Sequence, residues 1–179
     1  MKRSIILLAV FLTSALFAQT TPNTQLKIGY VDSEVIMSQF SEAIKAKSDL
    51  DGLVAKWRAE ADSMNKEIQT LYANFQAKDQ TNGFKGDEKA VAQKNLVDKD
   101  QKLQQYNQAK FGQPNGEYFV KQDQLLAPVK KKIFAAIETV AKEENMQYVL
   151  DKNGDVIVLY ADPQFDITFK VLDRLKRGK

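Results

Sequence analysis

The chain has 179 residues, no cysteine, no histidine and a formal net charge of +3. This composition excludes disulfides, the usual zinc, copper and haem ligands, the cysteine nucleophile and the histidine general base. An enzyme would have to rely on Asp, Glu, Lys, Ser or Tyr alone, so we expect no catalytic residues, no metal site and no cofactor.

The N-terminus has the layout of a secretory signal peptide. Lys2 and Arg3 are basic, residues 5–12 are apolar, and Ala18 ends a run of small and apolar residues before the expected cleavage. The alternative is a membrane anchor, although the apolar run is too short to span a bilayer. Residues 1–18 carry two basic and no acidic side chains, so cleavage lowers the net charge from +3 to +1. Nucleic-acid binding therefore loses its compositional support.

The mature chain begins with a polar stretch, residues 19–25, followed by a short β-type run at residues 26–31 and a possible helix cap at Asp32-Ser33. Residues 41–77 then predict a long helix of roughly 55 Å. Its apolar residues repeat every 3.5 positions, which is typical of a coiled-coil seam. This predicted arm seam consists of Leu50, Val54, Trp57, Ala61, Met64, Ile68, Leu71 and Phe75. A narrow seam on a polar helix implies one partner helix.

A turn containing Asn82-Gly83 is expected at residues 78–87, with Asp87 capping the next helix. Helical sequence resumes at residues 88–110 and again at about 118–145, where a broader apolar stripe indicates burial against several neighbours. These segments predict a helical hairpin, the arm, at residues 41–140, with its tip near 78–88.

The stretch FGQPNGEYF at residues 111–119 interrupts the returning helix with poor helix formers. In an antiparallel hairpin that turns near residue 82, residues 111–116 face residues 49–54. Gly52, the only glycine of the first helix, lies in that window. Gly112, Pro114, Gly116 and Gly52 are therefore a candidate hinge, and chance alignment of the four residues is the alternative.

The C-terminal region predicts a β-hairpin, with runs at residues 147–150 and 156–160 around Asn153-Gly154, and then a short amphipathic helix from Asp166. The segment DKNGD at 151–155 is similar to part of a calcium-binding EF-hand loop. However, Val156 occupies the position that requires glycine, which favours the turn.

The predicted fold class is α+β, with a small β-rich head at residues 19–40 and 141–179 that carries the arm. A head this small, with a strand that is apolar on both faces, predicts an oligomer that shares a β core. The expected oligomerisation core is Ile28, Tyr30, Val149, Val156, Val158, Tyr160, Ile167, Val171 and Leu172.

Four segments resemble the Skp/OmpH-like periplasmic chaperone family: KIGYVDSEVIM at 27–37, LLAPVKKKIFAAIETVAKE at 125–143, YVLD at 148–151 and LYADPQFDITFKVLDRL at 159–175. The resemblance implies a periplasmic homotrimer whose β-rich head serves for trimerisation. Three helical arms would surround a cavity that holds unfolded outer-membrane proteins without ATP. The expected arm tip departs from the basic tips of the best-studied members. Residues 78–89 contain three lysines and three acids and are neutral, so any contact with a membrane surface is expected to be weak.

Other interpretations stay open at this stage. The chain could be an exported coiled-coil structural or adaptor protein that binds one folded envelope partner. Trp57 could pack inside the arm or face a client protein. Lys130-Lys131-Lys132 could bind a polyanion, although three consecutive helical residues cannot share one face, so a solvated flank is the simpler interpretation.

Overall fold

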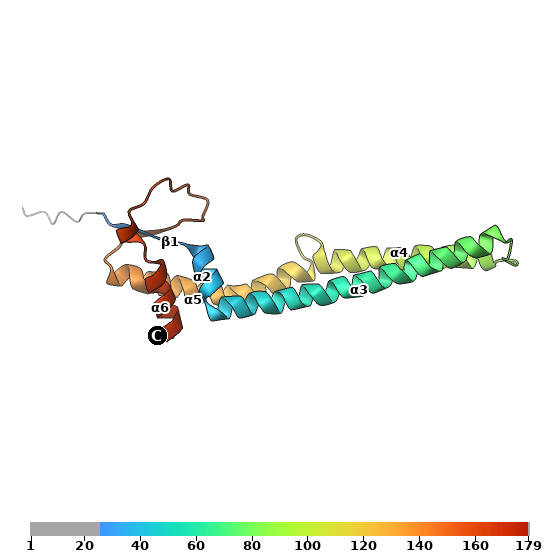
Figure 1. Ribbon diagram of the computed structural model, residues 1–179, viewed down its shortest axis with the longest axis horizontal. Coiled ribbons are helices and arrows are strands. Elements are labelled where there is room, and N and C mark those ends of the chain that lie inside the picture. Colours follow the sequence, from blue (N-terminus) through green and yellow to red (C-terminus); the bar gives the residue numbers. More distant parts are fainter. Residues whose placement is uncertain (1–25, 179) are drawn as a thin grey trace, which may run out of the picture.

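The computed structural model describes residues 26–178, so the predicted signal peptide and the polar stretch up to Gln25 lie outside the described residues. The molecule has two visibly different parts, a small head and one long arm (Figure 1). The head contains two short strands, three short helical segments and the end of a long helix. The arm is a hairpin of long helices.

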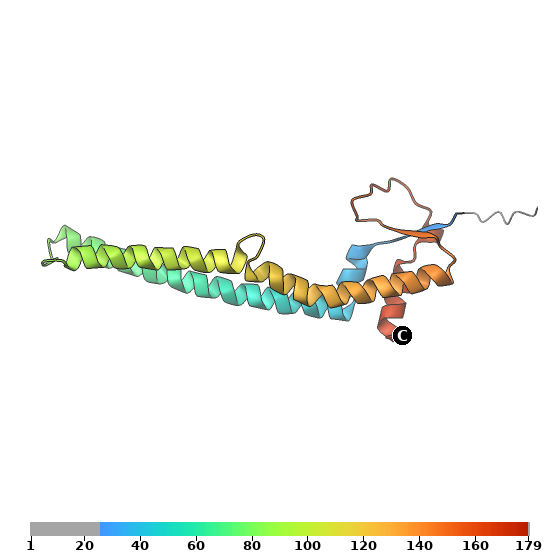
Figure 2. The ribbon, with the colours of Figure 1, turned by 180° about the vertical axis from the view of Figure 1, so that it is seen from behind.

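The arm is built from α3 (Ser41–Gln80), α4 (Glu88–Phe111) and α5 (Glu117–Glu143). With 40 residues, α3 is about 60 Å long at 1.5 Å per residue. Helices α4 and α5 follow one another along α3 in the opposite direction (Figures 1 and 2). The predicted helical hairpin is therefore confirmed, and its turn occupies residues 81–87.

The sheet differs from the prediction. Strand β1 (Ile28–Val31) pairs in parallel with β2 (Tyr148–Asp151), and Ile28 lies opposite Tyr148. The predicted turn after β2 is present, because the Gly154 N–H donates to the Asp151 carbonyl at 3.2 Å. Residues 156–160 nevertheless form no strand, so the predicted hairpin is wrong. A strand that is apolar on both faces needs cover on both, which one chain does not provide.

Side-chain hydrogen bonds join the ends of the head elements. Asp32 caps α2 (Ser33–Gln39) by accepting from the Val35 N–H at 3.0 Å, as the sequence predicts. The Asp32 N–H donates to the hydroxyl of Thr168, the first residue of α6 (Thr168–Arg177), at 2.9 Å. The Asp151 carboxylate accepts from the Ser33 N–H at 3.2 Å. These bonds fix α2, α6 and the end of β2 at one junction.

The Asp151 carboxyl and the turn at Asp162 also have structural roles. Burial raises the pKa of Asp151, but hydrogen bonds from Ser33 and Asn153 outweigh it, so the net pKa is lowered. Asp162 accepts from the Gln164 N–H at 3.0 Å and starts the 3-10 turn η1 (Pro163–Phe165). DKNGD and the Asp162 turn are therefore parts of the head framework.

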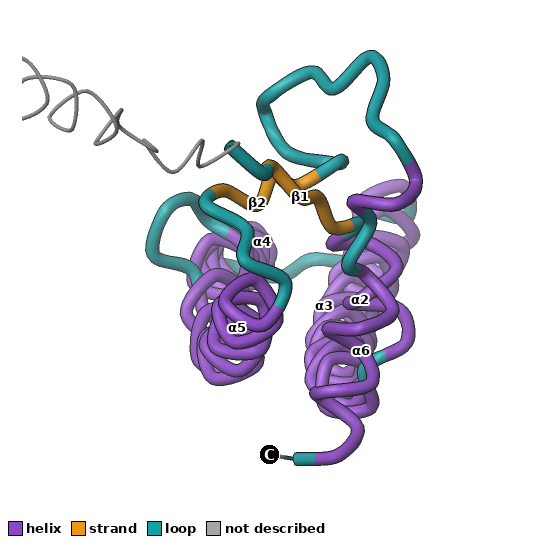
Figure 3. Tube along the Cα trace, turned by 90° about the vertical axis from the view of Figure 1, so that its left-hand side faces the viewer, coloured by secondary structure: helices purple, strands orange, loops and turns teal. Residues whose placement is uncertain are grey.

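The hydrophobic core lies in the head and the base of the arm. In the end-on view, α5 stands on one side and α2, α3 and α6 on the other, with the sheet above them (Figure 3). Ile36, Ile167, Val171 and Leu172 are at most 2% exposed. The core continues past both predicted head boundaries, through Ala43, Ala46, Val129, Ile133 and Ala136. The arm is thus rooted in the head core.

Candidate functional site

The arm seam marks where α3 meets the returning helices. Leu50 and Trp57 are buried, and the other six predicted seam residues are intermediate in exposure. Beyond Trp57, neither α3 nor α4 contains a fully buried residue. Two helices in contact along one stripe leave most of their surface to solvent, so the outer arm presents surface and has no core of its own.

An aromatic and charged cluster, which we call the joint cluster, lies where α4 ends. Trp57 is 5% exposed and packs edge-on against Phe111, with ring centroids 6.0 Å apart. The Lys110 ammonium lies 5.3 Å from the Trp57 ring centroid and 5.5 Å from that of Tyr106. It also pairs with Glu117, the first residue of α5, at 2.6 Å. Trp57 is therefore packed inside the arm.

Tyr106 completes the joint cluster. Its hydroxyl donates to the Glu60 carboxylate at 2.5 Å and links α4 to α3. Burial, the hydrogen bond to Glu60 and the negative charges of Glu60 and Glu117 raise the pKa of Tyr106 to about 12. We did not predict Tyr106, Lys110, Glu60 or Glu117 from the sequence. The signal that could have found them is the hairpin register, which places Tyr106 opposite Glu60.

Three of the candidate hinge residues, Gly112, Pro114 and Gly116, lie in the loop between α4 and α5, and Gly52 lies on α3. The loop at residues 112–116 closes on itself, because the Gly116 N–H donates to the Gly112 carbonyl at 2.6 Å. A Cβ at Gly112 would overlap the Gln108 carbonyl, and one at Gly116 would come within 2.7 Å of the Gly112 carbonyl. Gly52, by contrast, is exposed, and a Cβ there would meet nothing within 4 Å. Tight loop closure therefore requires glycine at 112 and 116, whereas packing does not require it at 52.

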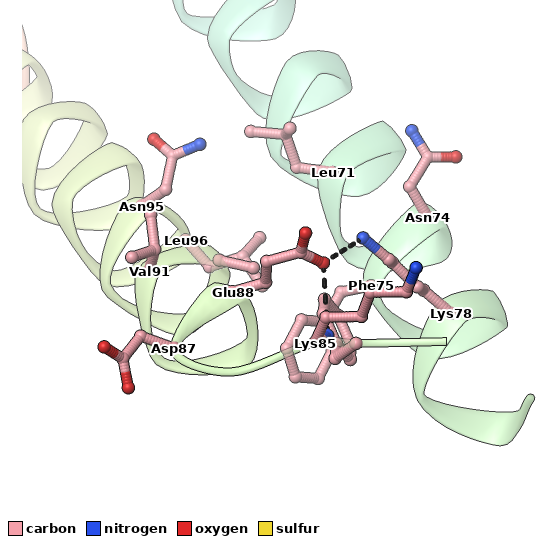
Figure 4. Close-up of a pocket in the computed structure, with 12 residues that line it drawn as sticks. Leu71, Asn74, Phe75, Lys78, Lys85, Asp87, Glu88, Val91, Asn95 and Leu96 are labelled. Atoms are coloured by element: carbon pink, nitrogen blue, oxygen red, sulfur yellow. Dashed lines mark hydrogen bonds and ion pairs between the residues drawn. The ribbon is translucent and has the colours of Figure 1, made fainter. Parts of the chain in front are cut away.

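The arm tip carries an open apolar groove of about 620 Å³ between the end of α3 and the start of α4 (Figure 4). Phe75 and Phe84 lie 5.1 Å apart between ring centroids, and the Lys78 ammonium lies 5.0 Å from the Phe84 ring. The Glu88 carboxylate pairs with Lys78 at 2.7 Å and accepts from the Lys85 N–H at 3.3 Å.

These bonds lower the pKa of Glu88, chiefly through the hydrogen bond from Lys78. Asp87 occupies the position before α4, but its side chain makes no capping hydrogen bond. The predicted cap at Asp87 is therefore wrong, because its backbone, with φ −83° and ψ 3°, is not in the extended conformation typical of a capping residue. Lys89 pairs with Asp79, so ion pairs neutralise both lysines on the helices at the tip.

The head exposes an apolar segment at residues 156–160. Val156 is 60% exposed, Ile157 84%, Leu159 94% and Tyr160 82%. Of the predicted oligomerisation residues, Val156, Val158 and Tyr160 lie here, and Ile28 is exposed on β1. Ile167, Val171 and Leu172 are instead buried within the chain itself. Tyr30, Val149 and Val158 are intermediate.

No group of three or more acidic side chains within residues 26–178 is placed to hold a metal ion. Over the same residues, no helix combines the length and hydrophobicity needed to cross a membrane.

Comparison with known proteins identifies the family. Residues 27–175 match the family described as outer membrane protein (OmpH-like). The chain belongs to the OmpH-like family. A solved structure from Caulobacter crescentus CB15, proposed to be an OmpH-like outer membrane chaperone, is similar with a TM-score of 0.70. The two chains are 18% identical, and the alignment covers 86% of each. No curated protein matches.

The structural likeness confirms the predicted α+β fold of a small head with a helical arm. The OmpH-like motifs of this chain are concentrated in the head and its junction with the arm, since they fall in β1, α2, the end of α5, β2 and α6. Helix α4 contains none of them, although the family match extends through α4.

Proposed function

We propose that this OmpH-like protein is a periplasmic, ATP-independent chaperone that binds unfolded outer-membrane proteins and prevents their aggregation. Family membership supports a chaperone role. The signal-peptide pattern of residues 1–18 supports export.

The observation that carries the proposal is the arm itself. The part of the arm beyond Trp57 contains more than half of α3 and all of α4, but no side chain of these two helices is fully buried there. Large apolar residues are exposed at separate points along the arm, and of these Val91 borders the apolar groove at the tip: Ile44, Tyr72, Val91, Val97, Val120 and Phe134. Scattered apolar points on a solvated rod suit many weak contacts with an extended chain better than one tight contact with a folded partner.

We propose that the working form is a homotrimer. The most exposed large apolar side chains of the described head lie within residues 156–160, and Leu159 is 94% exposed. A neighbouring subunit would cover the apolar side chains that residues 156–160 expose in the single chain. Three arms around one cavity would then strengthen binding, because a client held by one arm is at a high effective concentration for the other two arms.

The test is aggregation of a urea-unfolded outer-membrane β-barrel protein on dilution, followed by light scattering, with the mass of the chaperone measured on the same sample. We expect suppression at about one trimer per client. A matched pair of variants locates the activity. Replacing Tyr72, Val91, Val97 and Val120 by Gln should weaken suppression. Replacing the exposed Lys94 and Lys102 by Gln should not.

Two results would reject the proposal. One is unchanged aggregation at several-fold excess of correctly assembled protein. The other is stoichiometric capture of a single folded envelope protein with no protection of unfolded barrels, which would support the structural or adaptor role.

A further inference from the structure

Interactions across the hairpin show that the returning helix contains extra residues. From the tip to the joint cluster, the partners Lys78–Glu88, Glu67–Lys99 and Tyr106–Glu60 have residue numbers that add to 166. Trp57–Phe111 adds to 168. Near the head, Glu42–Lys132 adds to 174. Because the sum is constant along a regular antiparallel hairpin, about six residues have been added between Phe111 and Lys132.

The burial pattern agrees with an addition of this size. Among the less exposed positions of α4 and α5, one set in each helix recurs every three or four residues: Ala92, Leu96, Lys99, Leu103, Tyr106 and Lys110 in α4, and Gln122, Leu126, Val129, Ile133, Ala136 and Val140 in α5. If residues 112–116 are left out of the count, the less exposed positions of α5 continue those of α4 with the same spacing of three or four residues. Five is also the number of residues between α4 and α5.

The geometry of the loop agrees with this count. Its ends are joined by the hydrogen bond between Gly116 and Gly112, and by the Lys110–Glu117 ion pair. The loop projects from the arm, while α4 and α5 continue in the same direction on either side of it (Figures 1 and 2). Only the loop therefore leaves the path of the returning helix.

We propose that residues 112–116 are an in-phase insertion extruded from an otherwise continuous arm helix, and that Lys110 holds the resulting joint closed. The Lys110 side chain is 17% exposed and bonds to the first residue of α5, while its ammonium lies beside two aromatic rings of α3 and α4. Cation–π contacts and a partly desolvated ion pair are stronger than exposed ones. Loss of Lys110 frees the start of α5 from the end of α4, and the outer arm can pivot there.

The insertion is tested with two deletions in the full chain. Deleting residues 112–116 should leave the helix content and the unfolding transition at or above those of the parent, because the two stripes align. Deleting residues 112–118 removes two residues more and rotates α5 by about 200° relative to α4. This second deletion should lower both quantities. Equal damage by the two deletions would overturn the insertion.

Lys110 is tested by a distance measurement across the joint. The chain has no cysteine, so spin labels can be placed at the exposed Lys102 and Lys131. Dilution with unlabelled chain isolates distances within one chain. Lys110→Met keeps the aliphatic stem and removes the charge. Lys94→Met, the control, removes an ion pair made within α4 alone.

Electron–electron distance distributions should be narrow in the parent, narrow in Lys94→Met, narrow in the 112–116 deletion and broadened in Lys110→Met. A Lys110→Met distribution as narrow as that of Lys94→Met would show that Lys110 does not hold the joint. These readouts need no client protein, so their failure and the failure of the proposed chaperone activity are separate results.

Discussion

The head and the arm of this protein are stabilised in different ways. The head brings residues from both ends of the chain into one core in which Ile36 and Val171 have no exposed surface. The arm is a stripe of half-buried side chains between two helices, with the joint cluster around its buried Trp57. A compact core favours one conformation, whereas a long two-helix contact can bend or open locally at small cost. The fold therefore concentrates stability where the arm is attached.

The largest expected effect comes from the head core. Ile36→Ala should cost about 2–5 kcal/mol of unfolding free energy, because a fully buried side chain leaves a cavity. Ile68→Ala, in the arm seam, should cost only about 1 kcal/mol, since Ile68 keeps part of its surface in solvent. Denaturant unfolding at one fixed protein concentration measures both. Equal losses would mean that the arm is as tightly packed as the head.

The next effect distinguishes two glycines of the arm. Gly112→Ala should destabilise the protein by about 1–3 kcal/mol, because the new Cβ would overlap the Gln108 carbonyl. Gly52→Ala should stabilise it by about 0.5–1 kcal/mol, since an exposed helical position favours alanine. Thermal unfolding of the two variants checks the opposite signs. Destabilisation by Gly52→Ala would indicate that Gly52 has a conformational role in the arm.

Sequence periodicity was sufficient to predict the arm but not the sheet. The 3.5-residue spacing of the seam and the turn at Asn82-Gly83 are local signals, and they specify a helical hairpin without tertiary information. The pairing of Ile28 with Tyr148 joins positions 120 residues apart. Asn153-Gly154 is a local signal for a turn between two strands, whereas no local signal predicts the pairing of β1 with β2. The turn is present, but residues 156–160 do not form the second strand of a hairpin.

The joint shows a second limit of sequence reasoning. Glycine and proline content located the break at residues 111–119, but not the chemistry that surrounds it. Lys110 and Glu117 look like ordinary surface charges in sequence, because an ion pair across an extruded loop has neither helical nor strand spacing. Only the register of the folded hairpin brings Lys110 to Trp57.

A smaller effect is expected from titration of the joint cluster. The pKa of Tyr106 is raised to about 12 in the folded protein from its usual 10.0. The neutral hydroxyl is therefore favoured by folding. The stability it contributes is fully present below pH 10 and is lost as the pH rises through 12. Absorbance at 295 nm should show late tyrosine titration, and Tyr106→Phe should remove part of it, because the pKa of Tyr30 is also raised. A titration curve unchanged by Tyr106→Phe would contradict this assignment.

The smallest effect is expected from two exposed carboxylates, Glu88 at the tip and Glu138 on α5 near the head. Lys78 and Lys142 lower the pKa of Glu88 and of Glu138, respectively, so each interaction is present above pH 4.5 and is lost as the pH falls through the lowered folded-state pKa. Glu88 joins the end of α3 to the start of α4, whereas the pair made by Glu138 stays within α5.

Glu88→Gln should therefore speed amide hydrogen exchange at residues 78–88. Glu138→Gln should leave exchange in the head unchanged, because the head core holds α5 without that pair. Slow exchange at the tip of Glu88→Gln would show that the Phe75–Phe84 contact alone is enough to close the arm. In that case the stability of the tip would be hydrophobic, and the contrast between head and arm would be one of degree.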